Sequence, residues 1–219
     1  MAGLTAALVG ERLAEIRERI STAGGDSRSL AIVAVTKDFG LDAVQAALDN
    51  GLHEFGENRA DQLIAKAAAV QTGVVWHYLA RVQRNQVRKI AAHVDLWQAV
   101  DRVAAGEEIA KRAPDADILV QVNVSGEPQK HGARPEDVPG LVVHLSTLGL
   151  DVRGLMAVGP TGPPEAARVG FRTVRRLATR LALPACSMGM TDDLEVAVQE
   201  GSTMLRIGRG LFGDRPSTT

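Results

Sequence analysis

The sequence contains few aromatic residues, few lysines and a single cysteine. Of 219 residues, seven are Phe, Trp or Tyr, five are Lys and only Cys186 is a cysteine. One cysteine cannot form an internal disulfide or a multi-thiolate metal site, which excludes a zinc ribbon and is typical of a reducing compartment. We therefore expect a cytoplasmic protein without a metal site.

An excess of one charge and long apolar runs are also lacking. The 25 basic residues nearly balance 26 acidic ones, for a formal net charge of -1. Nucleic-acid binders generally need a basic surface or aromatic stacking platforms, and this composition favours neither. No apolar run approaches the roughly 20 residues of a membrane span, and the N-terminal stretch has no signal-type apolar core. We expect neither nucleic acid nor a membrane as a partner.

Short apolar runs alternate with amphipathic stretches along almost the whole chain. A lead-in helix is predicted within residues 1–24, because leucines and isoleucines recur at helical spacing from Leu4 to Thr22. Eight apolar runs follow, at Leu30–Thr36, His53–Phe55, Val74–Leu79, Asp95–Val100, Ile118–Asn123, Val152–Val158, Ala185–Met188 and Thr203–Ile207. Seven helix-like segments separate or follow them, at Leu41–Asn50, Arg59–Val70, Gln83–His93, Arg102–Arg112, Pro135–Leu148, Pro164–Leu181 and Asp192–Glu200.

Apolar strands separated by single helices indicate a parallel sheet that helices cover. Eight such strands predict an α/β fold: a single (β/α)8 TIM-like barrel over residues 30–213, with an extra N-terminal helix and one domain spanning 1–219. An open doubly wound sheet with fewer true strands is the alternative, since the runs at His53–Phe55 and Ala185–Met188 are short.

Lys37 ends the first apolar run and shares its strand face with Val33 and Val35. In barrels of this kind the functional site lies at the carboxyl ends of the strands. If this face lines the barrel, Lys37 enters the mouth, where desolvation lowers its pKa towards the neutral amine that attacks a carbonyl. A lysine that extends to water is the alternative. Three further lysines fall in amphipathic helices, where we expect solvated faces: Lys66, Lys89 and Lys111.

Small and polar residues follow the last two predicted strands. They are Ser187-Met188-Gly189-Met190-Thr191 and Gly208-Arg209-Gly210. Barrels frequently hold a phosphate at these two positions, because free N–H groups and a helix dipole favour an anion there. Ordinary turn chemistry is the alternative.

Two polar residues fall within the strands themselves. Arg206 alternates with Met204, and an inward-facing arginine needs an acceptor, either a ligand ring nitrogen or carboxylate or a structural salt bridge. His77 is either a base or a hydrogen-bonded core histidine.

Local strings along the chain resemble the pyridoxal phosphate homeostasis protein (YggS/PROSC) family, one of the fold-type III families related to the N-terminal domain of alanine racemase. The strings occur in the family's order and cover nearly the whole chain. They are Val35-Thr36-Lys37, Phe55-Gly56-Glu57-Asn58, Trp76-His77-Tyr78, Gln83-Arg84-Asn85, Asn123-Val124-Ser125, Arg153-Gly154-Leu155-Met156, Ser187 to Asp193, Arg206-Ile207-Gly208 and Phe212-Gly213.

This resemblance implies a barrel that carries pyridoxal 5′-phosphate (PLP) as a Schiff base on Lys37. It also implies that Arg206 faces the pyridine nitrogen; an arginine cannot accept a proton, so it weakens the electron sink that amino-acid enzymes exploit. Arg209 stands where the family usually has Thr, so the hydroxyl contact is not carried over. The cofactor-binding residues so implied are Lys37, Asn58, His77, Met156, Ser187, Gly189, Arg206, Gly208 and Arg209.

We expect a PLP carrier that takes part in intracellular vitamin B6 homeostasis, with little or no catalysis of its own. Related racemases place a tyrosine from a C-terminal β-domain opposite the lysine, whereas the one tyrosine here, Tyr78, falls within the barrel and the sequence runs only seven residues beyond Phe212. A small PLP-dependent amino-acid racemase is the alternative, and a cofactor-free Schiff-base aldolase is another. PLP is the expected ligand and PLP-accepting apo-enzymes are candidate partners. We expect a monomer, with a dimer as the alternative.

Overall fold

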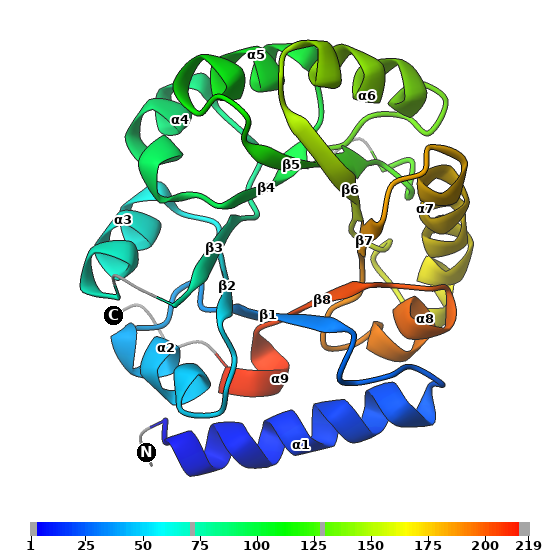
Figure 1. Cartoon of the computed structure of the whole chain (residues 1–219). Helices are drawn as coiled ribbons and strands as arrows, with labels where there is room; N and C mark the ends of the chain where they lie inside the picture. The colour runs from blue at the N-terminus through cyan, green and yellow to red at the C-terminus, as the bar shows by residue number, and fades with distance from the viewer. Residues whose placement is uncertain (1–3, 71–72, 128–129, 215–219) are drawn as a thin grey trace.

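A computed structural model describes residues 4–70, 73–127 and 130–214, and in it eight parallel strands close into a barrel inside a ring of helices (Figure 1). The strands follow chain order around the barrel: β1 (Ala31–Val35), β2 (Glu54–Glu57), β3 (Val75–Tyr78), β4 (Leu96–Val100), β5 (Asp117–Val122), β6 (Asp151–Ala157), β7 (Ala185–Ser187) and β8 (Met204–Ile207). The predicted TIM-like barrel is confirmed, and the open sheet is wrong because β1 pairs with β8 along four residues.

The helices alternate with the strands as predicted. They are α1 (Ala6–Thr22), α2 (Leu41–Leu48), α3 (Ala60–Ala69), α4 (Arg84–Ile90), η1 (Ala91–His93), α5 (Val103–Arg112), α6 (Val138–Thr147), η2 (Pro164–Ala167), α7 (Arg168–Arg180), α8 (Leu194–Gln199) and α9 (Arg209–Phe212). The short helix α9 was not predicted, and the predicted helix over 164–181 begins with the separate 3-10 turn η2. Over the described ranges, no helix combines the length and apolarity needed to cross a membrane.

Alternate residues of each strand face the helices and the barrel interior. On β5, Ile118, Val120 and Val122 belong to the large apolar cluster that the helices cover. Leu119, between them, belongs to a small interior cluster with Leu96, Ala99 and Met156. Both strand faces are therefore buried, which is why the strands are apolar runs without a polar alternation.

The N-terminal helix α1 occupies the outer ring between α2 and α8, alongside α9 (Figure 1). Its apolar face is buried, and the Thr5 hydroxyl caps its start by accepting from the Leu8 N–H at 3.2 Å. Near its other end, Arg19 pairs with Glu195 of α8 at 2.6 Å and donates to the Thr191 carbonyl at 2.9 Å. The helix is thereby tied to the segment that follows β7.

Lys66 of α3 does not face solvent, so the expectation from its helix was wrong. Its ammonium donates to Glu57 Oε1 at 2.5 Å and to the Thr36 carbonyl at 2.7 Å, and the Glu57 side chain is fully buried. The Thr36 hydroxyl donates to the same carboxylate oxygen at 2.7 Å. This buried group lies between α3 and the strands. Lys37 follows Thr36 directly, so strand alternation places it on the opposite side from this buried group.

Candidate functional site

The carboxyl ends of β1 and β8 border a cavity of about 410 Å³. Because these two strands pair in parallel, the residues that follow them meet at one edge of the barrel. Half-buried Lys37 and the Gly208-Arg209 turn both line the cavity. Its volume lies within the roughly 300–1,000 Å³ that is typical of small-molecule pockets. The full lining is Val35, Lys37, Phe39, Gly208, Arg209, Gly213 and Asp214.

The two turns predicted to hold phosphate lie side by side. The Gly210 N–H donates to the Thr191 hydroxyl at 3.0 Å, and Arg209 forms an ion pair with Asp192. Gly189 has a φ of 95°, and a Cβ there would lie 2.4 Å from the Ala197 Cβ, so this turn requires glycine. Arg209 therefore brings a positive charge to the cavity of Lys37, although Asp192 holds its guanidinium in this structure.

Asn58 follows β2 and lies apart from the cavity of Lys37. It borders a second cavity, of about 440 Å³, between α3 and α4. Its side-chain oxygen is buried and has no hydrogen-bond partner within the described residues. A buried acceptor of this kind is uncommon and is available to a donor that is not part of the chain.

Arg206 faces the barrel interior, where it is 5% exposed. Its guanidinium donates to the Ser187 carbonyl, the Ser187 hydroxyl and the Ala157 carbonyl, each at 2.8 Å. Burial lowers the pKa of Arg206 to about 10, an effect that the charge of Asp193 partly opposes. The salt bridge that the sequence left open does not form among the described residues; the oxygens that accept from this guanidinium are neutral.

His77 and Met156 also face the interior, below the mouth of the barrel. His77 Nδ1 lies 2.6 Å from the Gln98 side-chain nitrogen, and burial lowers the pKa of His77 to about 4. The histidine is therefore neutral near pH 7 and is a hydrogen-bonded core residue. Met156 packs against Leu119 in the interior cluster. Sequence reasoning missed Gln98, although it alternates with Leu96 as the polar member of an apolar run.

Tyr78 faces the helices. Its hydroxyl donates to Gln86 of α4 at 2.8 Å, and its ring packs edge-on against Trp97 with the centroids 5.7 Å apart. Burial raises the pKa of Tyr78 to about 12. The tyrosine and Lys37 therefore lie on opposite sides of the barrel wall. Among the described residues, no cluster of three or more His, Cys, Asp or Glu side chains is arranged to hold a metal ion.

Residues 12–216 match the alanine racemase N-terminal domain family, and the chain belongs to that family of barrels. Within it, the chain belongs to the pyridoxal phosphate homeostasis protein family. It is 38% identical over 211 residues to the pyridoxal phosphate homeostasis protein of Pseudomonas aeruginosa, covering 92% of each chain. It is 36% identical to the protein of that name from Aquifex aeolicus, covering 94% of this chain and 97% of the relative.

A solved structure of PipY from Synechococcus elongatus, with PLP bound, is 32% identical to this chain. The two superpose with a TM-score of 0.82 over 94% of this chain and 100% of PipY. Alanine racemase from Corynebacterium glutamicum is 13% identical, with a TM-score of 0.75 over 99% of this chain and 64% of the racemase, a likeness that shows the fold alone.

Proposed function

We propose that this protein binds PLP as a Schiff base on Lys37 and takes part in PLP homeostasis, with little or no catalysis of its own. The observation that carries this proposal is that Lys37 and the Gly208-Arg209 turn line one cavity at the β1–β8 junction. The relatives named for pyridoxal phosphate homeostasis and the PLP-bound structure of PipY support the choice of ligand.

The chain offers groups suited to each part of the ligand. PLP supplies an electrophilic aldehyde; the Lys37 amine forms a C=N bond with its carbon, and the aldehyde oxygen leaves as water. Backbone N–H groups of the turns that contain Ser187, Gly189, Gly208 and Arg209 would bind the phosphate. We further propose Arg206 for the pyridine nitrogen, with Asn58, His77 and Met156 as the remaining cofactor residues.

Homeostasis requires that PLP can leave the protein as well as bind to it. We therefore propose PLP-accepting apo-enzymes as recipients and a cytoplasmic monomer as the working form. We propose that residues 1–219 form one domain, with 1–24 as its N-terminal helix and 30–213 as its barrel. Residues 1–3, 71–72, 128–129 and 215–219 of that span lie outside the described residues.

Spectral titration with PLP tests the role of Lys37. We expect wild-type protein to develop the visible band of a Schiff base, and borohydride to remove the band and leave a phosphopyridoxyl mass on Lys37. Lys37→Ala should lose the band while retaining weak, phosphate-dependent binding. Lys111→Ala, an exposed lysine of α5, is the matched control and should behave as wild type. Absence of any band in PLP-treated wild type would overturn the proposal.

The racemase alternative makes a different prediction. A two-base racemase needs a second acid or base across the substrate from the lysine. Tyr78 is turned towards α4 and keeps its proton far above pH 7, so it does not supply that group. We expect PLP-loaded protein in D₂O to incorporate no deuterium at Cα of the common amino acids. Rapid incorporation that depends on Lys37 would instead favour the racemase.

A further inference from the structure

A row of polar side chains crosses the barrel interior from β8 to β2. Arg206 donates to the Ser187 hydroxyl at 2.8 Å, and that hydroxyl donates to Gln98 Oε1 at 2.7 Å. The Gln98 amide nitrogen lies 2.6 Å from His77 Nδ1, and His77 Nε2 faces Glu54 Oε2 at 3.4 Å. The last contact is an approach rather than a formed bond, because Nε2 has no hydrogen-bond partner within the described residues.

With the Gln98 amide oriented as in this structure, the direction of every bond in the row follows. A guanidinium can only donate, so the Ser187 oxygen accepts from Arg206 and its O–H points to the Gln98 carbonyl. The Gln98 amide then presents its N–H₂ to His77 Nδ1, which must accept. Burial keeps His77 neutral, with its pKa lowered to about 4, so its single proton lies on Nε2 and faces Glu54.

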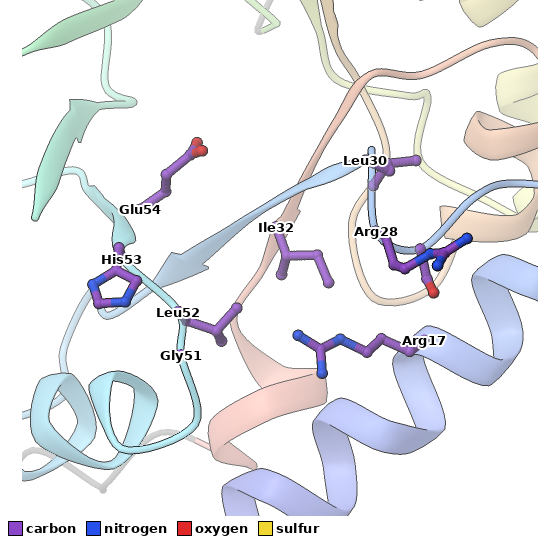
Figure 2. A pocket seen from close by; sticks show the side chains of 9 residues that line it. Arg17, Arg28, Leu30, Ile32, Gly51, Leu52, His53 and Glu54 are labelled. Atoms are coloured by element: carbon purple, nitrogen blue, oxygen red, sulfur yellow. The ribbon is translucent and has the colours of Figure 1, made fainter.

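Glu54 connects this row to the opposite end of the barrel. It begins β2, where its side chain is 35% exposed, and it borders a cavity of about 520 Å³ with Arg17, Leu52 and other residues. Figure 2 shows its carboxylate directed away from the imidazole of His53, as strand alternation requires. The donors of the row all point from Arg206 towards Glu54. A guanidinium at the first end and a carboxylate at the last stabilise hydrogen bonds that are aligned in this direction.

We propose that Gln98 is a positioning residue that orients Arg206 by fixing the Ser187 hydroxyl. Gln98 lies in the interior on β4, whereas Lys37 and the Gly208-Arg209 turn are at the mouth. Its carbonyl holds the Ser187 proton and so leaves an oxygen lone pair directed at Arg206. Without that acceptor the hydroxyl can rotate, and the guanidinium loses one of its three fixed oxygens. That the orientation of Arg206 affects the pyridine ring of PLP rests on the proposed function.

The tautomer of His77 tests the row without any ligand. Nitrogen-15 NMR of wild-type protein without PLP should show His77 protonated on Nε2 and unprotonated on Nδ1 at pH 7. A proton on Nδ1 would mean that the Gln98 amide is turned the other way, with its nitrogen towards Ser187, and would overturn the proposal. This measurement needs no variant, so it stands even if a substituted barrel fails to fold.

Gln98→Met tests the effect on the ligand end, with Gln121→Met as the matched control. Gln121 is also a buried residue of the barrel, on β5, but its amide donates to the His131 carbonyl and lies outside the row. We expect Gln98→Met to bind PLP about tenfold more weakly, the effect of one buried hydrogen bond, and to shift the position of its absorption band. Gln121→Met should match wild type in both.

The two proposals fail in different ways. If PLP-treated wild type shows no band, the proposed function is wrong, and the His77 tautomer still reports on the row. If wild type binds PLP and Gln98→Met shows the same Kd and the same band, Gln98 has no positioning role, while binding through Lys37 stands.

Discussion

Among single residues, Lys37 and Lys66 show how two lysines close to the same strand end take opposite roles. Lys66 is held by the Glu57 carboxylate and the Thr36 carbonyl in a buried group. Lys37 is half-buried and lines a cavity. Because Thr36 precedes Lys37 directly, the buried group fixes the end of β1 from the helix side and leaves the next side chain for the mouth. The ion pair thus supports the candidate site without taking part in it.

Removing one member of the Glu57–Lys66 pair should be strongly destabilising. Lys66→Met leaves a buried carboxylate without its cation, and we expect the free energy of unfolding in urea to fall by about 3–5 kcal/mol. Adding Glu57→Gln removes that charge and should restore most of the loss. Lys111→Met, at an exposed position of α5, is the control and should change stability little. Equal stability of Lys66→Met and the control would contradict a buried pair.

Among strands and helices, two glycines differ in whether there is room for a side chain. In β6, a Cβ on Gly154 would lie 2.1 Å from the Ala185 carbonyl oxygen of β7, a backbone atom that cannot rotate away. In α6, a Cβ on Gly140 would meet nothing within 4 Å. The close pairing of β6 with β7 therefore requires glycine at position 154, whereas the packing of α6 does not require glycine at position 140.

The same substitution should have opposite effects at these two glycines. Gly154→Ala forces β6 away from β7, and we expect it to lower the free energy of unfolding by about 1–3 kcal/mol. Gly140→Ala removes the backbone entropy of a helical glycine and should raise it by roughly 0.5–1 kcal/mol. Urea unfolding of both variants measures the difference. A loss at Gly140 or no loss at Gly154 would contradict the packing of these elements.

The order of strands and helices could be predicted from the sequence because buried parallel strands are apolar throughout. Boundaries were less accurate where polar residues belong to a strand: β2 extends to Glu57, whose carboxylate is buried only because Lys66 meets it. Lys66 occurs three residues after buried Leu63 on the same helix face, and that spacing was the available signal. Helix α9 is too short for its periodicity to be recognised.

For the whole barrel, the sequence indicated which residues end the strands but not which interior residues meet across it. Lys37, Gly208 and Arg209 were predicted at one site because each follows a strand, and the structure brings them to one cavity. Gln98 and Glu54 were not predicted, because contacts among β2, β3, β4 and β7 depend on the stagger of a closed barrel. The residue types alone do not specify that stagger.

Because His77 is neutral in the barrel interior, we expect the free energy of unfolding to decrease as pH falls. The pKa of His77 is about 4 in the folded protein and about 6.5 when unfolded, so the unfolded state binds more protons between these values and stability falls as pH falls. We expect a loss of about 2 kcal/mol between pH 7 and pH 5. Burial raises the pKa of Glu54, which acts in the opposite direction at lower pH.

Urea unfolding at several pH values, with a non-titrating variant, isolates this contribution. His77→Gln should show a shallower fall in unfolding free energy from pH 7 to pH 5 than wild type, whatever its stability at pH 7. His144→Gln removes an exposed histidine of α6 and should keep the wild-type slope. Parallel slopes for wild type and His77→Gln would show that His77 does not titrate as expected.

The pairing of β1 with β8 has a consequence for the order of events during synthesis. Residues 31–35 leave the ribosome well before their second neighbour in the sheet, residues 204–207. One edge of β1 therefore stays unpaired until β8 has been synthesised, and a contact this distant in sequence forms slowly. Since Lys37 and the Gly208-Arg209 turn flank that junction, the cavity that they line exists only once the barrel has closed. Under the proposed function, PLP binding would then favour the closed barrel over partly folded forms.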